Sequence, residues 1–279
     1  MIIDFDSYLK NDDIRAFADF IRTSVQKKPN DWEWLILLEC ACTEHSQRNL
    51  KPGNTSDRIF SALVNDAAAD TTTGASLFQK SVCHAIIAHD GRSEEFSEQE
   101  IQQIFKTVTY FGELWFDKSV DTKKIYLHAR IPAISQIYHF CHFDRWSVYD
   151  QHISSVLDGF AQDFAKANPD AAARLGDRIR FPVPDETGSE DQDFLRNGDL
   201  GAIKFVQASL LIRVLADNLN EHRVMRGSNR DWWPEGKWGF SQVARALSWL
   251  GESRKPRERQ EKTPDDSQLP VRGKLTLME

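Results

Sequence analysis

The residues with the clearest capacity for chemistry lie between Ala129 and Leu157. Trp146 to Tyr149 has the pattern of a short extended segment, and Asp150 stands where a helix is expected to begin. A carboxylate at that place accepts backbone N–H bonds from the first helical turn, is favoured by the helix dipole and is held in one direction. Asp150 is therefore either an ordinary helix N-cap or a fixed anion directed at a reacting group.

Basic residues gather in the same region although the chain as a whole is acidic. The chain has 35 Lys and Arg against 42 Asp and Glu, a net charge of −7, which excludes a generally basic nucleic-acid coat protein. Binding of phosphates needs a local basic patch more than a basic total charge. The region 123–145 is therefore either a phosphate-binding surface or a solvated charged face. Its basic residues are Lys123, Lys124, Arg130 and Arg145, with Asp144 as the acid and His128, His139 and His142 in the same window.

Two motifs in this region resemble the helix-hairpin-helix DNA glycosylase superfamily. The stretch IPAIS at 131–135 resembles the family's hairpin, and VYD at 148–150 resembles the turn that carries its catalytic aspartate. The string IYHFCHFDRWSVYDQHISSVL is more similar still to a bacterial branch related to 8-oxoguanine DNA glycosylases. The resemblance covers about thirty residues well and extends weakly to 238–250, whereas the first 110 residues match nothing in the family.

The resemblance implies a mainly helical, glycosylase-like fold and the removal of a modified or damaged base from DNA. Asp150 takes the place of the catalytic aspartate, which stabilises the positive sugar formed as the N-glycosidic bond breaks, or orients the attacking water. Members that also cleave the strand use a lysine after the hairpin. Gln136 and Ile137 occupy that place here, so we expect base removal alone, with no metal and no cofactor.

The resemblance also implies a set of DNA contacts. Backbone N–H groups around Pro132 would hold a phosphate, Arg130 and Arg145 would contact further phosphates, and aromatic rings would stack on the extruded base or wedge into the duplex. Core packing is the alternative for each ring. The implied contacts with DNA are Pro132, Ser135, Gln136, Arg130, Arg145 and His152, and the implied base-pocket or wedge residues are Tyr138, Trp115, Trp232, Trp233 and Trp238.

Two other interpretations stay open. His139 and His142 would share a helix face suited to a metal, but no HExxH motif or matching acidic partner accompanies them. A non-catalytic helical subunit of a larger assembly, for instance in antiviral defence rather than DNA repair, would bind a protein or nucleic acid through the Trp-rich loop 223–240. Nucleotide-binding and serine-hydrolase motifs are absent from the sequence.

Apolar residues recur at three- and four-residue spacing, which predicts a mainly helical protein. Ser97 and Glu100 form a capping box that opens a helix toward Trp115. A further stretch, 178–193, is predicted to be an extended segment followed by a surface loop. Other predicted helices follow 11–13, begin near 31, 56 and 76, and cover 151–164, a short stretch from 169, 200–219 and 241–250, whereas 131–143 is an apolar and aromatic block.

The organisation of the chain and its location follow from the same patterns. We expect an N-terminal helical portion of residues 1–95, a glycosylase-like portion of residues 96–251 and a flexible tail from residue 252. No apolar run approaches the ~20 residues of a membrane helix, and the first residues carry acids where a signal peptide carries bases. We therefore expect a cytoplasmic protein with no membrane contact. Its four cysteines, which include no CxxC pair, are expected to be buried free thiols.

Overall fold

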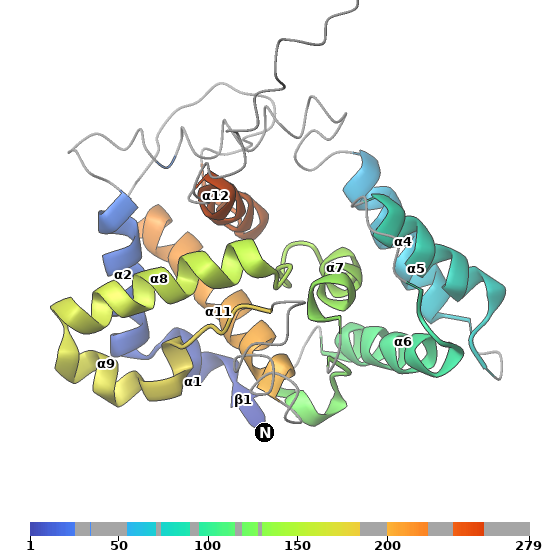
Figure 1. Ribbon diagram of the computed structural model, residues 1–279, viewed down its shortest axis with the longest axis horizontal. Coiled ribbons are helices and arrows are strands. Elements are labelled where there is room, and N and C mark those ends of the chain that lie inside the picture. Colours follow the sequence, from blue (N-terminus) through green and yellow to red (C-terminus); the bar gives the residue numbers. More distant parts are fainter. Residues whose placement is uncertain are drawn as a thin grey trace, which may run out of the picture.

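The computed structural model describes residues 1–25, 34, 55–70, 74–89, 95–114, 119–127, 130–184, 200–222 and 237–253. Within these ranges the chain is mainly helical, as predicted, with a single two-stranded antiparallel sheet (Figure 1). The strands are β1 (Ile2–Asp4) and β2 (Ser119–Asp121), and the short 3-10 helices are η1 (Thr122–Lys124) and η2 (Gly176–Ile179). The α-helices are α1 (Phe5–Leu9), α2 (Asp12–Val25), α4 (Thr55–Ala68), α5 (Leu77–His89), α6 (Glu98–Glu113), α7 (Ile131–Cys141), α8 (Gln151–Ala167), α9 (Pro169–Leu175), α11 (Leu200–Glu221) and α12 (Phe240–Ser253).

Several helices begin at the polar residues that the sequence marks as caps. The capping box of α6 is confirmed: the Ser97 hydroxyl accepts a bond from the Glu100 backbone N–H at 3.3 Å, and the Glu100 carboxylate accepts one from the Ser97 backbone at 2.8 Å. Asn11 accepts a bond from the backbone of Ile14 in the first turn of α2. The predicted helix from residue 31 lies outside the described residues except for Trp34, which is helical and buried, and so do the loop 223–236 and the tail from 254.

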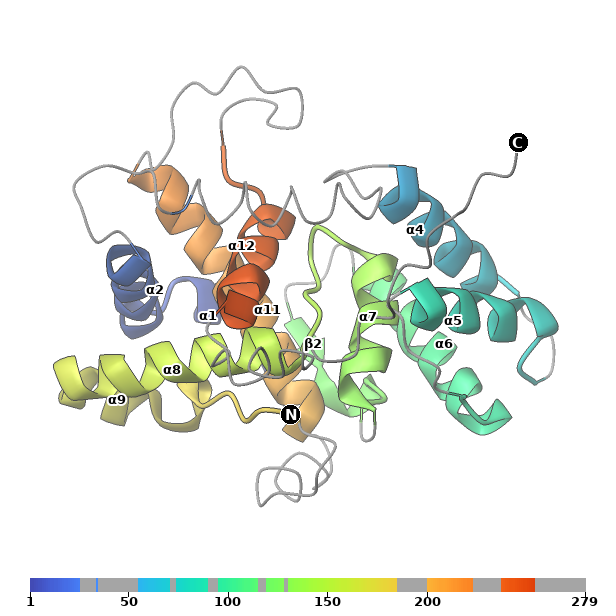
Figure 2. The ribbon, with the colours of Figure 1, turned by 45° about the horizontal axis from the view of Figure 1, so that its top comes forward.

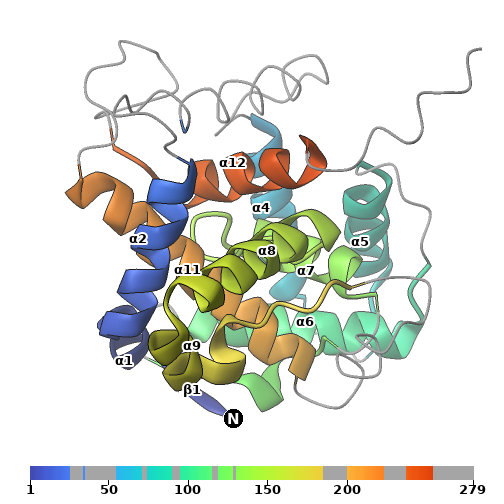
Figure 3. The same cartoon turned by 60° about the vertical axis from the view of Figure 1, so that its left-hand side comes forward.

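The helices pack in two groups that share one core. α4 and α5 lie beside α6 and α7, whereas α2, α8, α9 and α12 lie around α11 (Figures 1 and 2). β1 pairs with β2, with Ile3 opposite Val120. The predicted N-terminal portion 1–95 contributes helices to both groups, because α2 packs on α11 while α4 and α5 pack on α6 and α7 (Figure 3). The apolar face of α2 needs a partner surface that only later helices supply.

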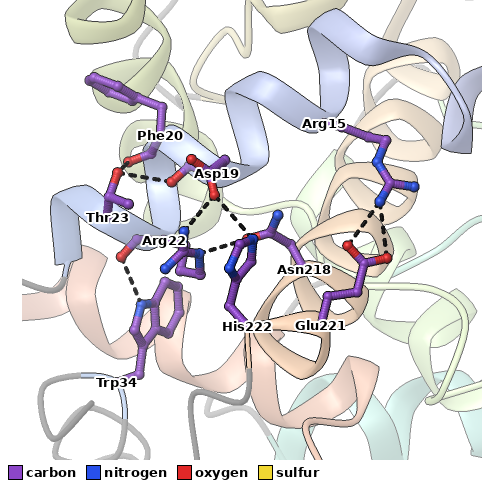
Figure 4. A network of polar contacts seen from close by, with 9 residues as sticks. All are labelled: Arg15, Asp19, Phe20, Arg22, Thr23, Trp34, Asn218, Glu221 and His222. Carbon is purple, nitrogen blue, oxygen red and sulfur yellow. Dashed lines mark hydrogen bonds and ion pairs between the residues drawn. The ribbon is translucent and has the colours of Figure 1, made fainter. Parts of the chain in front are cut away.

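Polar side chains join α2 to the end of α11 (Figure 4). Arg15 donates from Nη2 to both carboxylate oxygens of Glu221, at 3.0 and 2.8 Å. Arg22 donates to Asp19 at 2.5 Å and to the Asn218 side chain at 2.9 Å. Exposed ion pairs contribute at most about 1 kcal/mol each. We infer that these contacts fix the relative positions of the two helices and that apolar burial supplies most of the stability.

Two buried thiols are expected to make the folded protein less stable in alkaline solution. Cys83 and Cys141 are buried and free, as the sequence predicts, and burial raises the pKa of each thiol from 9.0 to about 12. The unfolded chain therefore releases these protons first, so stability is complete below pH 9 and falls as the pH rises toward 12, by about 1 kcal/mol per thiol between pH 9 and 10. Burial also raises the pKa of Tyr8 and Tyr138, which adds to the loss, whereas it lowers the pKa of Lys204 to about 8, which opposes it.

Denaturant unfolding at pH 8, 9, 10 and 11 measures this dependence. We expect the free energy of unfolding to fall above pH 9, and the double variant Cys83→Ala, Cys141→Ala to be less stable at pH 8 but to lose less between pH 9 and 10. An equally steep alkaline loss in the double variant would contradict the assignment to the thiols.

Candidate functional site

Asp150 is the N-cap of α8, as predicted. Its backbone is extended, with φ −119° and ψ −178°, and its Oδ1 accepts bonds from the backbone N–H groups of His152 and Ile153, both at 2.9 Å. Its Oδ2 accepts no hydrogen bond from any residue in the described part of the chain, and the residue is half-buried. The helix thus fixes one carboxylate oxygen and leaves the other available to a ligand.

The segment that leads to Asp150 is held by three other parts of the chain. The backbone N–H of Tyr149 donates to the Ser135 hydroxyl of α7 at 2.9 Å, and the Tyr149 hydroxyl donates to the Pro182 carbonyl at 2.9 Å. Two residues earlier, the backbone N–H of Ser147 donates to the Ser209 hydroxyl of α11 at 3.1 Å. The position of the carboxylate is therefore set by long-range contacts as well as by its own helix, as a preorganised site requires.

The end of α12 touches the first turn of α8. A Cβ atom placed on Gly251 would lie 2.5 Å from the carbonyl oxygen of His152 and 2.8 Å from its carbonyl carbon. Glycine is therefore the one residue that fits without a shift of backbone. Because the His152 N–H is one of the two donors to Asp150, the packing of α12 against α8 also affects the position of the Asp150 carboxylate.

The stretch 131–135 does not form a hairpin loop. Ile131–Cys141 is the helix α7, with Pro132 in its first turn. Ser135 is fully buried; its hydroxyl donates to the Pro132 carbonyl and accepts from Tyr149, while Gln136 is only 7% exposed. The predicted hairpin is wrong: Ala133 stands where a hairpin has a glycine, and alanine has the highest helix propensity. Ser135 positions the segment before Asp150 and, like Gln136, does not present itself to a phosphate.

The two arginines expected at phosphates already have partners and lie apart in the structure. Arg130, in the left-handed region at φ 52°, donates to the Glu95 carbonyl and lies 3.9 Å from the Glu100 carboxylate. Arg145 is half-buried, donates to the Leu114 carbonyl at 2.9 Å and lies over the rings of Phe5 and Trp146. The two guanidinium groups therefore do not form a shared basic surface for phosphates.

Of the aromatic residues predicted to stack on a base, two are buried in the core and the others lie outside the part of the chain that the structure describes. Tyr138 is fully buried, and its hydroxyl donates to the Tyr126 carbonyl at 2.6 Å. Trp238 is 4% exposed, and its ring lies edge-on to Trp34. Both belong to the core, which corrects the prediction of a base-contacting role for them. The other three, Trp115, Trp232 and Trp233, lie outside the described residues.

Sequence reasoning missed a basic cleft of about 410 Å³ between α6 and the segment that contains η1. Three lysines line it, and none of them forms an ion pair with a described residue. The ammonium of Lys124 lies 4.9 Å from the centre of the Tyr110 ring, and Glu113 is the one acid among the described residues of the lining. Lys123 and Lys124 belong to the predicted basic window, but Lys106 lies outside it and only α6 brings it near. We name this the lysine cleft: Lys106, Lys123 and Lys124 with Tyr110 and Tyr126.

The lysine cleft and the segment before Asp150 both contact α7. Tyr126, in the cleft, accepts a bond from Tyr138, and Tyr149 donates its N–H to Ser135. Ser135 and Tyr138 are three residues apart, which is about 4.5 Å along the helix axis and one face of the helix. A single helix thus connects the basic cleft with the carboxylate segment.

The structure adds two findings on metals and membranes. Within the described ranges, no group of three or more His, Cys, Asp or Glu side chains is placed to hold a metal ion. His139 Nδ1 lies 2.6 Å from the Trp146 carbonyl oxygen, and burial lowers the pKa of His142. None of the described helices is long and apolar enough to cross a membrane.

No protein-family model, no curated protein and no solved structure matches the chain. What the protein does is therefore inferred from Asp150, from the residues that hold it and from the lysine cleft.

Proposed function

We propose that the protein is a DNA glycosylase with a glycosylase-like helical fold, which removes a modified or damaged base through Asp150 and does not cleave the strand. The geometry of one carboxylate carries the proposal. Two backbone N–H groups fix Oδ1 of Asp150, and Oδ2 has no partner in the described part of the chain. The resemblance of 137–157 to glycosylases, which includes Asp150, is the second support.

Hydrolysis of an N-glycosidic bond requires one negatively charged group that is held in a fixed position. As the N-glycosidic bond breaks, the bonding electrons leave with the base and positive charge develops on the deoxyribose. A carboxylate that is already oriented stabilises this charge without reorganising at the moment of reaction. Water then adds to the anomeric carbon; its hydroxyl stays on the sugar and its proton is passed on through the carboxylate to solvent or to the departing base. Asp150 Oδ2 suits both tasks.

The lysine cleft supports the proposal that the substrate is DNA. A duplex must be held by its phosphates while one nucleotide leaves the stack. Lys106, Lys123 and Lys124 lie without ion-pair partners among the described residues, and α7 connects their cleft with the segment before Asp150. In this proposal the phosphates are held by the three lysines, in place of Arg130 and Arg145.

The test is the formation of abasic sites. Purified protein is incubated with duplexes that contain normal, oxidised, alkylated or deaminated bases, and alkali then cleaves the strand wherever a base is missing. We expect strand breaks on at least one modified DNA after alkali, and intact strands before it. Breaks on no DNA would overturn the proposed function, and breaks without alkali would overturn the absence of strand cleavage.

Removing the lysine cleft should weaken DNA binding and its dependence on salt. The triple variant Lys106→Gln, Lys123→Gln, Lys124→Gln is expected to reduce the slope of log binding constant against log salt by up to about 2.7, because each phosphate contact contributes about 0.9. Fluorescence anisotropy with labelled duplex between low and physiological salt measures the slope.

A matched triple variant controls for net charge. Lys10, Lys80 and Lys166 each lie near one carboxylate, at 3.2, 3.9 and 3.0 Å, on other exposed parts of the chain. Their replacement by glutamine changes the net charge equally and should leave most of the slope intact. Equal slopes for the two triple variants would exclude the cleft as the phosphate site.

One observation favours the alternative of a non-catalytic binding subunit. Leu77 and Phe78, in the first turn of α5, are 81% and 41% exposed. Adjacent exposed apolar side chains are typical of contact surfaces when they belong to a larger patch. The double variant Leu77→Ser, Phe78→Ser should leave the formation of abasic sites unchanged if the glycosylase proposal holds.

A further inference from the structure

A second cavity, of about 360 Å³, lies between α1, α11 and the start of α12. Its walls are mainly apolar and aromatic, and Asp150 is not among its lining residues. The volume and the apolar lining lie in the range of small-molecule sites. We name it the aromatic pocket; its apolar residues are Phe5, Leu9, Trp146, Leu210 and Phe240.

The polar groups of the aromatic pocket favour an anion. Arg213 lines it from α11, is exposed, and forms no hydrogen bond or ion pair with any residue in the described part of the chain. Arg145 lines it as well, held over the Phe5 ring at 5.1 Å and the Trp146 ring at 5.5 Å. Among the described residues of the lining, Asp144 is the one acid. The guanidinium of Arg213, which interacts electrostatically with Asp217 of the same helix, lies beside apolar walls and matches the planar geometry of a carboxylate.

Trp146 adds an independent observation. This residue is 1% exposed, and its indole Nε1 is a buried donor with no acceptor in the described part of the chain. A buried indole N–H normally has an acceptor, because an unpaired one costs about 1–3 kcal/mol. Trp146 is part of the pocket wall, and none of the described residues supplies this donor with an acceptor.

We propose that the aromatic pocket binds a small organic acid with a flat aromatic body and one carboxylate. The body packs between the Phe5 and Phe240 rings and the two leucines, and the carboxylate pairs with Arg213. This binding does not depend on base removal at Asp150, so its test is independent of the test of the proposed function.

The experiment is isothermal titration of the full chain with three acids of increasing size: benzoate, phenylacetate and indole-3-acetate. Indole-3-acetamide, which has the same ring without the charge, is the matched ligand. We expect at least one acid to bind, and indole-3-acetate to bind about tenfold more tightly than its amide, since one such pairing is worth about 1.4 kcal/mol.

Three variants test the residues. Arg213→Gln should weaken binding of the acid about tenfold and leave the weak binding of the amide unchanged. Arg58→Gln removes one exposed arginine of α4 outside the pocket and should change neither. Leu9→Trp, once its melting temperature shows that it folds, should block both ligands by filling the cavity.

The proposal is overturned if none of the three acids binds at millimolar concentration, or if the acid and the amide bind equally. It is also overturned if Arg213→Gln and Arg58→Gln have the same effect. Unchanged binding in Asp150→Asn is expected, and it separates this site from the one proposed for base release.

Discussion

Replacement of Asp150 by asparagine is expected to lower the rate of base release by at least about a hundredfold, the loss typical of removing one preorganised electrostatic group. The fold should remain, because the amide oxygen of asparagine accepts the same two N–H bonds at the start of α8. What disappears is the negative charge beside the developing positive sugar. The measurement is the single-turnover rate of abasic-site formation, together with the melting temperature of each protein.

Asp158→Asn is the matched control for this prediction. Asp158 lies on the same helix, and its replacement by asparagine removes one negative charge, as in Asp150→Asn. Its Oδ1 also accepts a bond from the backbone, that of Phe181, at 3.2 Å. We expect Asp158→Asn to release bases at the wild-type rate. A rate for Asp150→Asn within a factor of two or three of wild type would assign Asp150 to helix capping alone.

Gly251→Ala is expected to lower the free energy of unfolding by about 2 kcal/mol or more, the upper range for overpacking of a core. The added Cβ would meet the carbonyl oxygen, carbonyl carbon and Cα of His152 at 2.5, 2.8 and 2.9 Å. These are backbone atoms, so α8 and α12 must separate. Because His152 donates to Asp150, the variant should also release bases more slowly at temperatures where it is still folded. Denaturant unfolding and the abasic-site assay at 20 °C measure the two effects.

The chain offers a matched glycine without a close neighbour. A Cβ on Gly112 of α6 would meet no atom within 4 Å, so Gly112→Ala should stabilise the protein by about 0.5–1 kcal/mol through the helix propensity of alanine. We therefore expect the two alanine variants to change the free energy of unfolding in opposite directions. A free energy for Gly251→Ala equal to that of wild type would show that α12 can move away from α8 without loss.

Local signals in the sequence predicted the starts of the helices well. The capping box at Ser97 and the N-cap at Asp150 depend only on residues two or three positions apart, and both are confirmed. At 131–135, two signals compete: the resemblance predicts a hairpin, whereas a proline in a first turn and alanine at the next position favour a helix. The helical propensity of the residues prevails.

The sequence could not predict which distant residues meet. Nothing near Ser135 shows that its hydroxyl accepts a bond from the backbone of Tyr149, and nothing near Gly251 shows that α8 lies against it. Lys106 stands well before the basic window, and only the packing of α6 beside η1 brings it to Lys123 and Lys124. Periodicity identifies a buried helix face but not the element that covers it.

The separation in sequence between α2 and its partners has a consequence for how the chain folds. Arg15 meets Glu221 across 206 positions, and the start of the chain meets Thr122 across 121. The contacts among α4, α5, α6 and α7 join elements that are much closer in sequence, so this group is able to form early while the chain is being synthesised. α2 must wait for α8, α9 and α11, the later helices that it packs against, and until then its apolar face of Ile14, Phe17 and Ile21 is not covered by them. Slow completion of long-range contacts makes that face the part of the nascent chain most exposed to aggregation and to chaperones.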